Sequence, residues 1–237
     1  MIIIPARLAS TRFEQKVLVD VAGLPMVVRT AKRVAHLDRV VVAADDEKIV
    51  EVCKNYGVEA ILTSKEHNSG TDRINEAAKK LNLSDDELVI NVQADEPFIE
   101  DNVVWELLKR LKTLDKNSFV MASAYAKIDK ARADDANLVK VVVDDFNNAL
   151  YFSRSAIPFD RSGGANYFGH IGIYGFNKKS LEEFCSFKPS SLEDIEKLEQ
   201  LRALANGKKI SMIEVNTKSF GIDTKEDLAR ALEVFVN

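Results

Sequence analysis

Cysteine, histidine and long apolar runs are all scarce in this chain of 237 residues, and each shortage excludes a class of protein. The two cysteines, Cys53 and Cys185, stand far apart without a C-x-x-C pattern, so we expect reduced, buried thiols and no disulfide framework. The three histidines lack the spacing of zinc ligands. No apolar run approaches the ~20 residues that a membrane-spanning helix needs.

An excess of positive charge is also lacking. The formal net charge is -4, whereas nucleic-acid-binding proteins usually carry a basic excess on one face. The apolar start of the chain is too short for a signal peptide, because Pro5 and Arg7 follow it at once. We therefore expect a cytoplasmic protein that binds neither nucleic acid nor membranes.

The first half of the chain alternates between short apolar runs and helical patterns. Val- and Ile-rich runs predict strands at residues 2–4, 39–43, 59–62 and 87–92. Apolar residues at helical spacing predict helices at residues 26–35, 47–56, 71–81 and 103–111. This order predicts an α/β fold whose mostly parallel sheet is covered by helices on both faces.

After residue 119 the sequence becomes richer in strands. Strand-like segments at 119–128, 138–144, 149–152 and 168–176 precede a closing helix, strand and helix at 192–205, 209–215 and 225–236. No repeat or Pro/Ser-rich linker marks a boundary, so we expect a single domain over residues 1–237, with about 119–185 as a sheet extension or small β-rich lobe. Its strands have apolar faces and little helix to cover them, which favours a homodimer built from this segment.

Basic side chains gather on the loop after the first predicted strand. Arg7, Arg12 and Lys16 share that loop with a single acid, Glu14. Ligands of open α/β sheets bind outside the carboxyl ends of the strands, so three cations there indicate an anion site, most simply for a polyphosphate. A solvated basic loop is the alternative.

Acidic side chains occupy two further positions of interest. Asp95 and Glu96 follow the strand at 87–92, where a carboxylate can hold a hard cation such as Mg²⁺; a solvated Asp/Pro turn is the alternative. Asp223 precedes Thr224, which is typical of a helix N-cap, and it could join Asp95 on a metal. An acid that simply initiates the last helix is equally compatible with that segment.

Three other features are weaker on their own. Residues 67–73, His-Asn-Ser-Gly-Thr-Asp-Arg, join a strand to a helix and suit an anion or a base edge, although ordinary helix capping has the same composition. Helical spacing places Glu199 on the inward face of the helix at 192–205, and strand alternation places Lys140 on one face with Leu138 and Val142. Each needs a partner or a ligand, so a structural ion pair and a functional role both stay open.

Eight segments in order make the chain resemble the CMP-Kdo synthetases, the 3-deoxy-manno-octulosonate cytidylyltransferases, nearly from end to end. They are IIPARLASTR (3–12), HNSGTDR (67–73), NVQADEP (91–97), LVKVVVD (138–144), ALYFSRSAIPFDR (149–161), HIGIYGF (170–176), LEQLRAL (198–204) and GIDTKEDL (221–228). The resemblance implies a three-layer α/β/α fold with a mixed central sheet and a small dimerisation lobe. Two positions depart from the family: Glu14-Gln15-Lys16-Val17 replaces the usual P-G-K-P, and Ala94 replaces the glycine before Asp95.

The resemblance also implies a role for each candidate residue. The phosphates of CTP would contact Arg7, Arg12 and Lys16, and the cytidine would contact Ser69, Gly70, Thr71 and Arg73. Mg²⁺ would bind Asp95 and Asp223, which with Lys16 and Arg12 form the catalytic set. The sugar acid would be surrounded by Gln93, Arg161, His170, Tyr174, Glu199 and Gln200, with Arg154 close by.

The sugar acid needs a cationic partner for its carboxylate, and we expect Arg161 and His170 to supply it. Strand alternation puts His170 and Tyr174 on the same face. A surface ion pair between Arg161 and Asp160 is the alternative.

The reaction implied is transfer of a cytidylyl group from CTP to Kdo, giving CMP-Kdo and pyrophosphate for lipopolysaccharide synthesis. In-line attack at the α-phosphorus needs positioning and charge neutralisation more than a covalent nucleophile. Alternatives are a cytidylyltransferase for another acidic sugar, such as sialic acid, and a non-catalytic nucleotide-binding module. A dinucleotide-dependent oxidoreductase is disfavoured, because no G-x-G-x-x-G follows the first strand.

Overall fold

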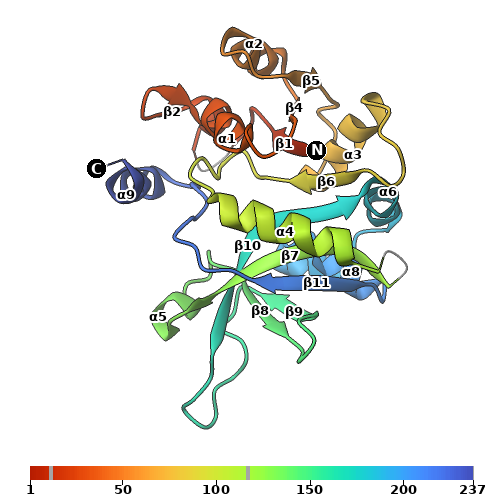
Figure 1. The fold of residues 1–237 in the computed structure, drawn as a ribbon. Helices are drawn as coiled ribbons and strands as arrows, with labels where there is room; N and C mark the ends of the chain where they lie inside the picture. Colours follow the sequence, from red (N-terminus) through yellow and green to blue (C-terminus); the bar gives the residue numbers. More distant parts are fainter. Residues whose placement is uncertain (11–12, 116–117, 237) are drawn as a thin grey trace. The chain divides into compact units, whose positions relative to one another are not determined.

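The computed structural model describes residues 1–10, 13–115 and 118–236. The chain forms two compact units, coloured along the sequence in Figure 1. The first contains Met1–Asp101 and Lys218–Asn237, and the second contains Asn102–Thr217. The predicted extension at 119–185 falls inside the second unit, which also includes later segments of the chain.

Parallel strands form the centre of the first unit. They lie in the order β6-β1-β4-β5, with β1 at Ile2–Ala6, β4 at Val40–Ala44, β5 at Ala60–Leu62 and β6 at Leu88–Asn91. β1 pairs in parallel with both β4 and β6, and β4 pairs in parallel with β5. The strands predicted at 2–4, 39–43, 59–62 and 87–92 are therefore confirmed, and the residues of β1 are buried on both faces.

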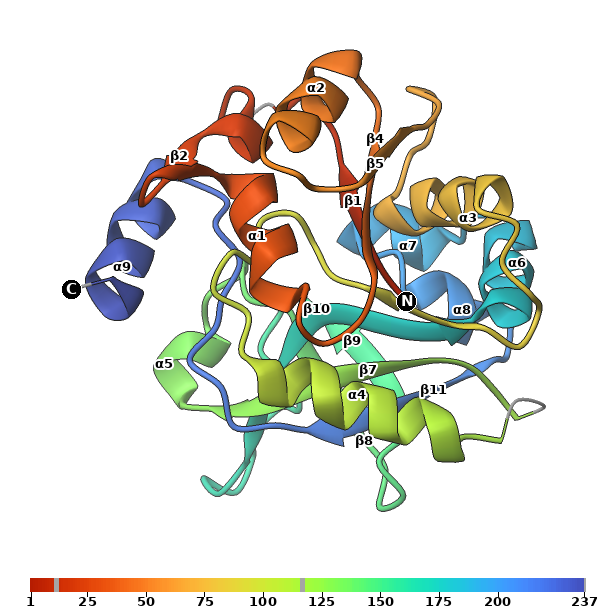
Figure 2. The same cartoon turned by 45° about the horizontal axis from the view of Figure 1, so that its top comes forward.

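Helices cover both faces of this sheet. α1 (Met26–Val34) and α2 (Glu47–Asn55) lie on one side of β1 and β4, and α3 (Gly70–Lys80) lies on the other (Figure 2). Right-handed crossovers require this: β1-α1-β4 and β4-α2-β5 step in one direction along the sheet, whereas β5-α3-β6 steps back. The alternation of strands and helices predicted for this half of the chain is confirmed.

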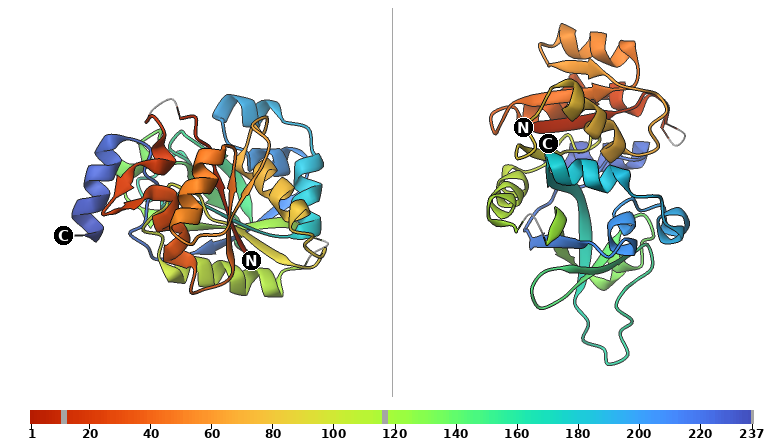
Figure 3. Two further views of the ribbon diagram at one scale, coloured as in Figure 1. Left: turned by 90° about the horizontal axis from the view of Figure 1, so that it is seen from above. Right: turned by 90° about the vertical axis from the view of Figure 1, so that its right-hand side faces the viewer.

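Shorter elements complete the first unit and bring its two chain segments together. η1 (Lys16–Leu18) leads into a hairpin of β2 (Asp20–Val21) and β3 (Leu24–Pro25), which is too short to leave a sequence period. The last helix, α9 (Lys225–Phe235), lies beside this hairpin (Figure 3, left). Ile222 and Ala231 share a buried cluster with Val21 of β2 and Met26 of α1, so burial of apolar surface holds the C-terminal segment against the hairpin and the start of α1.

The second unit holds a mixed sheet. Its strands lie in the order β11-β7-β10-β8-β9, with β7 at Phe119–Ile128, β8 at Lys140–Val143, β9 at Ala149–Ser153, β10 at Tyr167–Asn177 and β11 at Lys209–Glu214. β11 runs parallel to β7, and the other pairs are antiparallel. The strands predicted after residue 119 and at 209–215 are confirmed.

In the second unit one helix prediction is wrong and one helix was not predicted. The single helix expected at 192–205 is wrong: α7 (Ser191–Glu196) ends at Lys197, whose φ is 54°, and α8 (Leu201–Ala205) begins after a turn. As a result Leu192 and Ile195 are exposed to solvent. The sequence also failed to predict α6 (Lys178–Ser186), whose Asn177 cap accepts a hydrogen bond from the backbone N–H of Ser180.

α4 (Asp101–Thr113) and α5 (Lys130–Ala133) are the other helices of this part of the chain, and the first confirms the helix predicted at 103–111. Among the helices of the described residues, none is long and apolar enough to cross a membrane.

Candidate functional site

Lys16 joins the two predicted metal carboxylates in the first unit. Its Nζ donates to Asp95 Oδ2 at 2.6 Å and to Asp223 Oδ1 at 2.7 Å. Burial alone would lower the pKa of the Lys16 ammonium, but the two carboxylates outweigh this effect and leave its pKa raised. The structure thus brings together three residues that lie far apart in the sequence.

Backbone geometry explains why these carboxylates meet. Asp95 follows β6, which is the parallel neighbour of β1, so the segments after both strands leave the same edge of the sheet. The backbone N–H of Ile222 donates to the carbonyl of Asp95 at 2.9 Å. Because Ile222 is fully buried in the cluster beside α9, this bond places the next residue, Asp223, against the sheet edge.

The donor set around Lys16 fits a hard divalent cation. The described residues contain no group of three His, Cys, Asp or Glu side chains arranged to hold a metal by themselves. Mg²⁺ is usually held by only one or two carboxylates together with substrate phosphates, which is what Asp95 and Asp223 offer. Beside them, Glu96 is buried; burial and the charge of Asp95 raise its pKa to about 8, so it adds little charge at neutral pH.

The two departures from the family pattern are accommodated locally. Gln15 adopts φ 48°, a left-handed conformation that favours glycine, the residue usual at this position in the family. Its side chain accepts a hydrogen bond from Lys48 Nζ at 2.6 Å. Ala94 is buried, and its carbonyl accepts a hydrogen bond from Thr30 Oγ1 at 2.8 Å.

The start of α3 approaches the end of β1 closely. Ser69 caps the helix by accepting from the backbone N–H of Asp72 at 3.1 Å. A Cβ atom on Gly70 would lie 3.2 Å from Cγ of Pro5 and 3.5 Å from Oε1 of Gln93, so the missing side chain permits this approach. The residues predicted to bind cytidine therefore begin beside the end of β1. Thr71, within the same turn, is buried.

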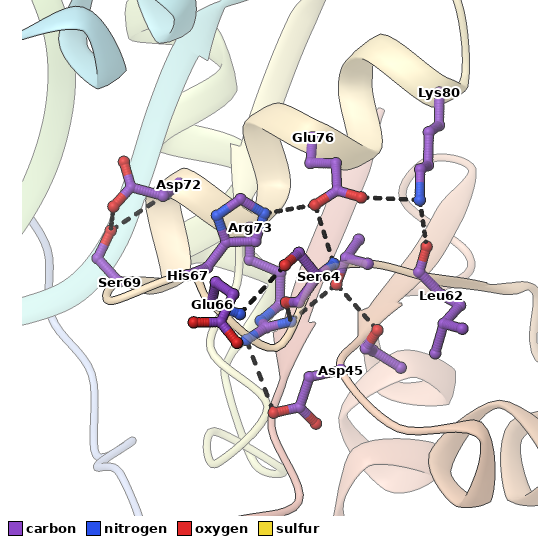
Figure 4. A network of polar contacts seen from close by, with 12 residues as sticks. Asp45, Leu62, Ser64, Glu66, His67, Ser69, Asp72, Arg73, Glu76 and Lys80 are labelled. Atoms are coloured by element: carbon purple, nitrogen blue, oxygen red, sulfur yellow. Dashed lines mark hydrogen bonds and ion pairs between the residues drawn. The ribbon is translucent and has the colours of Figure 1, made fainter.

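Arg73 is used differently from a ligand-binding arginine. Its side chain is only 4% exposed, and Nη1 donates to Thr63 Oγ1 at 2.8 Å and to the Ser64 carbonyl at 2.9 Å (Figure 4). These contacts support the loop between β5 and α3. Its contact with cytidine stays a prediction.

Of the remaining phosphate candidates, Arg7 is exposed on the first loop. Arg12 lies outside the described residues.

The second unit contains every sugar-acid candidate except Gln93, which belongs to the first. His170 and Tyr174 have ring centroids 5.6 Å apart, which confirms that they share a face of β10. Tyr174 Oη donates to Gln200 Oε1 at 3.2 Å. Burial, and then the charge of Glu199, raises the pKa of Tyr174. Glu199 and Gln200 reach this group from the turn between α7 and α8, not from a helix face.

His170 is a neutral imidazole at physiological pH, because burial lowers its pKa to about 3. Its Nε2 lies 2.8 Å from Ser123 Oγ, and that hydroxyl donates its hydrogen to the carbonyl of Ile173 at 2.8 Å. Nε2 is then the donor toward Ser123, and Nδ1 is left as an acceptor. Such a ring suits a sugar hydroxyl rather than a carboxylate, so Arg161 is the member of the predicted pair that offers positive charge.

Arg161 lies exposed in the long loop between β9 and β10 (Figure 1). The neighbouring Asp160 carboxylate accepts hydrogen bonds from the backbone N–H groups of Gly163, Gly164 and Ala165 at 2.6–3.1 Å. Asp160 therefore shapes the loop that carries Arg161.

Arg154 and Lys140 are tied to protein groups. Arg154 donates from its backbone N–H to the Glu196 carboxylate at 2.9 Å and from Nε to the Glu196 carbonyl at 2.8 Å. Lys140 is fully buried and donates to the carbonyls of Asp135, Leu138 and Arg154 at 2.6–2.7 Å. Neither an ion pair nor a ligand is needed to account for Lys140.

The family model described as cytidylyltransferase matches residues 1–210. A 3-deoxy-manno-octulosonate cytidylyltransferase of Wolinella succinogenes is 54% identical, with 99% of each chain covered. One of Helicobacter pylori is 56% identical, covering 99% of this chain and 97% of that protein. The chain belongs to the 3-deoxy-manno-octulosonate cytidylyltransferase family.

The fold of this cytidylyltransferase agrees with a solved structure of CMP:2-keto-3-deoxy-manno-octonic acid synthetase complexed with CTP. The TM-score is 0.91 at 36% sequence identity, covering 99% of this chain and 97% of that one. The predicted α/β nucleotidyltransferase fold is therefore confirmed.

Sequence reasoning missed three residues that support the candidates. Asp45 contacts Arg73, Ser123 contacts His170, and Glu196 holds Arg154. Only Asp45 left a usable signal, because it follows a predicted strand in the same way as Asp95.

Proposed function

We propose that this cytidylyltransferase joins CTP and Kdo to give CMP-Kdo and pyrophosphate, in the cytoplasm, for lipopolysaccharide synthesis. The observation that carries the proposal is the cluster of Lys16, Asp95 and Asp223 at the edge of the parallel sheet, in a chain of this family. A cation between two carboxylates is the arrangement expected where a metal–nucleotide complex binds.

The nucleotide is assigned to the first unit. The triphosphate would contact Arg7, Arg12 and Lys16, whose positive charges favour bound phosphate and stabilise the charge that develops on departing pyrophosphate. The cytidine would lie at Ser69, Gly70 and Thr71, beside the end of β1. Arg73 would act indirectly, because it supports the loop between β5 and α3 that leads to these residues.

Asp95 and Asp223 would hold Mg²⁺, which supplies charge neutralisation of the phosphates when it is bound. The Lys16 ammonium contacts one oxygen of each carboxylate, so a metal ion held between the same two carboxylates would take its place. We therefore propose that Lys16 pairs with the two carboxylates in the free protein and contacts the phosphates when CTP and Mg²⁺ are bound.

The sugar acid is assigned to Gln93, Arg154, Arg161, His170, Tyr174, Glu199 and Gln200. Arg161 would attract the carboxylate of Kdo, and the acceptor nitrogen of His170 would take a hydrogen bond from a sugar hydroxyl. The anomeric hydroxyl then attacks the α-phosphorus of CTP in line and releases its proton to solvent, while the bond from that phosphorus to the oxygen shared with the β-phosphate breaks and pyrophosphate leaves. Correct placement of these groups supplies much of the rate enhancement.

The decisive experiment incubates the purified protein with CTP, Mg²⁺ and either Kdo or sialic acid, and measures CMP-sugar and pyrophosphate. We expect CMP-Kdo with Kdo and little product with sialic acid. Product with sialic acid alone would transfer the assignment to another acidic sugar, and CTP binding without turnover would indicate a non-catalytic module.

Light scattering at assay concentration tests the homodimer proposed for the second unit, whose Phe146 and Leu150 are exposed.

A further inference from the structure

Asp45 connects two segments of the first unit that carry different nucleotide candidates. It follows β4 and is buried, and its Oδ1 accepts a hydrogen bond from the backbone N–H of Leu8 at 2.8 Å. Its Oδ2 lies 3.7 Å from Nη2 of Arg73 (Figure 4). One carboxylate thus contacts both the first loop, next to Arg7, and the arginine of α3.

The contacts continue from Arg73 into the loop between β5 and α3. Nη1 of Arg73 donates to Thr63 Oγ1 and to the Ser64 carbonyl. The backbone N–H of Ser64 donates to Glu76 Oε2 at 3.0 Å, and His67 Nε2 contacts the same carboxylate (Figure 4). This loop leads directly to Ser69, the cap of α3.

We infer that Asp45 is a positioning residue for CTP, which sets the phosphate-binding first loop and the cytidine-binding start of α3 in register with each other. The inference rests on the proposed assignment of CTP to these two segments. A nucleotide that spans both needs them at one fixed separation, and a carboxylate that accepts from one and pairs with the other provides it.

Charge gives Asp45 a second part in this arrangement. Burial lowers the pKa of Arg73, the charges of Asp45 and Glu76 oppose that effect, and the charge of Arg7 adds to it. Without Asp45, Glu76 would still offset the charge of the buried guanidinium, but the compensation would be smaller.

The test measures the dissociation constant of CTP, in buffer with Mg²⁺ and without sugar, for Asp45→Ala and Asp45→Asn. We expect Asp45→Ala to weaken CTP binding by about 10- to 100-fold, the loss typical of one hydrogen bond to a charged group. Asp45→Asn keeps an oxygen for the N–H of Leu8 and should recover part of the affinity. The KM for Kdo should stay near that of the wild type.

Asp46→Ala is the matched control, because Asp46 is the next acid along the chain. Its side chain caps α2 by accepting from the backbone N–H of Lys48 at 3.0 Å, and it pairs with Lys65. This variant should lower the melting temperature and leave CTP affinity unchanged. Asp45→Asn covers the case in which Asp45→Ala does not fold.

Wild-type affinity for CTP in both Asp45 variants would overturn the inference, as would an equal loss of affinity in Asp46→Ala. Wild-type protein that binds no CTP would instead refute the proposed function, and the positioning role with it.

Discussion

Two lysines with little exposure to solvent, one in each unit, show that low exposure alone does not identify a functional cation. Lys16 in the first unit donates to two carboxylates, and its pKa is raised. Lys140 in the second donates to three backbone carbonyls, and burial lowers its pKa. The residue type is the same, but the partners differ in charge.

The difference in partners decides what can replace each ammonium. The carboxylates of Asp95 and Asp223 keep their negative charge when Lys16 moves away, so a metal ion can take its place. The carbonyls around Lys140 are fixed in the backbone and carry no net charge, so their hydrogen bonds would be lost. Lys16 therefore belongs to an exchangeable site and Lys140 to the framework of the second unit.

The largest effect should come from the acidic partner of Lys16. Asp95→Asn should lower kcat by about 1,000-fold or more, because a neutral amide replaces a charge opposite the metal and each ~1.4 kcal/mol of transition-state stabilisation is tenfold in rate. A circular dichroism melt should show that the fold is retained. Glu59→Gln is the control, since it removes an acid from an exposed pair with Arg39. Near-normal turnover at saturating Mg²⁺ would show that Asp95 is not a metal ligand.

Lys140→Met should act on stability instead. Three backbone carbonyls lose their donor, which should lower the free energy of unfolding by about 2–4 kcal/mol. Urea denaturation measures this change, and CTP affinity should stay at the wild-type value. Lys127→Met, at an exposed position of β7, should change stability little. If Lys140→Met folded stably but lost CTP affinity, Lys140 would belong to the nucleotide site.

Lys16→Met distinguishes an exchangeable cation from a fixed one. Two facing carboxylates without the ammonium should repel each other and lower the melting temperature in metal-free buffer. Mg²⁺ should restore ~1–2 kcal/mol of stability, as a ligand that binds only the folded state does at concentrations well above its dissociation constant. The wild type and Lys140→Met should gain less from Mg²⁺. An equal gain in all three proteins would mean that Lys16 does not occupy the metal position.

Local patterns were enough to predict most elements but not the contacts between distant segments. The strand at 119–128 was predicted with the bounds observed, because strand character depends on neighbouring residues. The helix at 192–205 was wrong because the left-handed backbone of Lys197 ends α7, and helical spacing alone does not reveal such a residue. Turn conformation here depends on tertiary packing that no short window contains.

The candidate site likewise combines residues that local patterns predict with contacts that only the fold reveals. Residue type and position after strands singled out Lys16 and Asp95, but their meeting with Asp223 depends on the bond from Ile222 to the Asp95 carbonyl. Asp45 was overlooked, although it too is an acid just past a strand. Its partners, the backbone of Leu8 and the guanidinium of Arg73, become visible only once the strands are adjacent.

Arg161→Ala tests whether the second unit contributes an exposed cation that binds the carboxylate of Kdo. Loss of a charged hydrogen-bond partner for the carboxylate should raise the KM for Kdo by about 10-fold, since 1.4 kcal/mol corresponds to a factor of ten. The dissociation constant of CTP should not change. Arg132→Ala removes another exposed arginine of the same unit and should alter neither value. A variant that loses CTP affinity and keeps its KM for Kdo would reverse the assignment.

The smallest effect should come from the residue that places Lys16. Gln15 adopts φ 48°, whereas glycine takes this conformation without steric cost, so Gln15→Gly removes strain from the folded state. The flexible unfolded chain of a glycine variant offsets part of that gain, which leaves an increase of about 0.5 kcal/mol in the free energy of unfolding. Urea denaturation measures it. Lys48→Met, which removes only the hydrogen bond to the Gln15 side chain, is the control. If Gln15→Gly and Lys48→Met destabilised the protein equally, that side-chain bond, rather than the backbone conformation, would hold Lys16 between its two carboxylates.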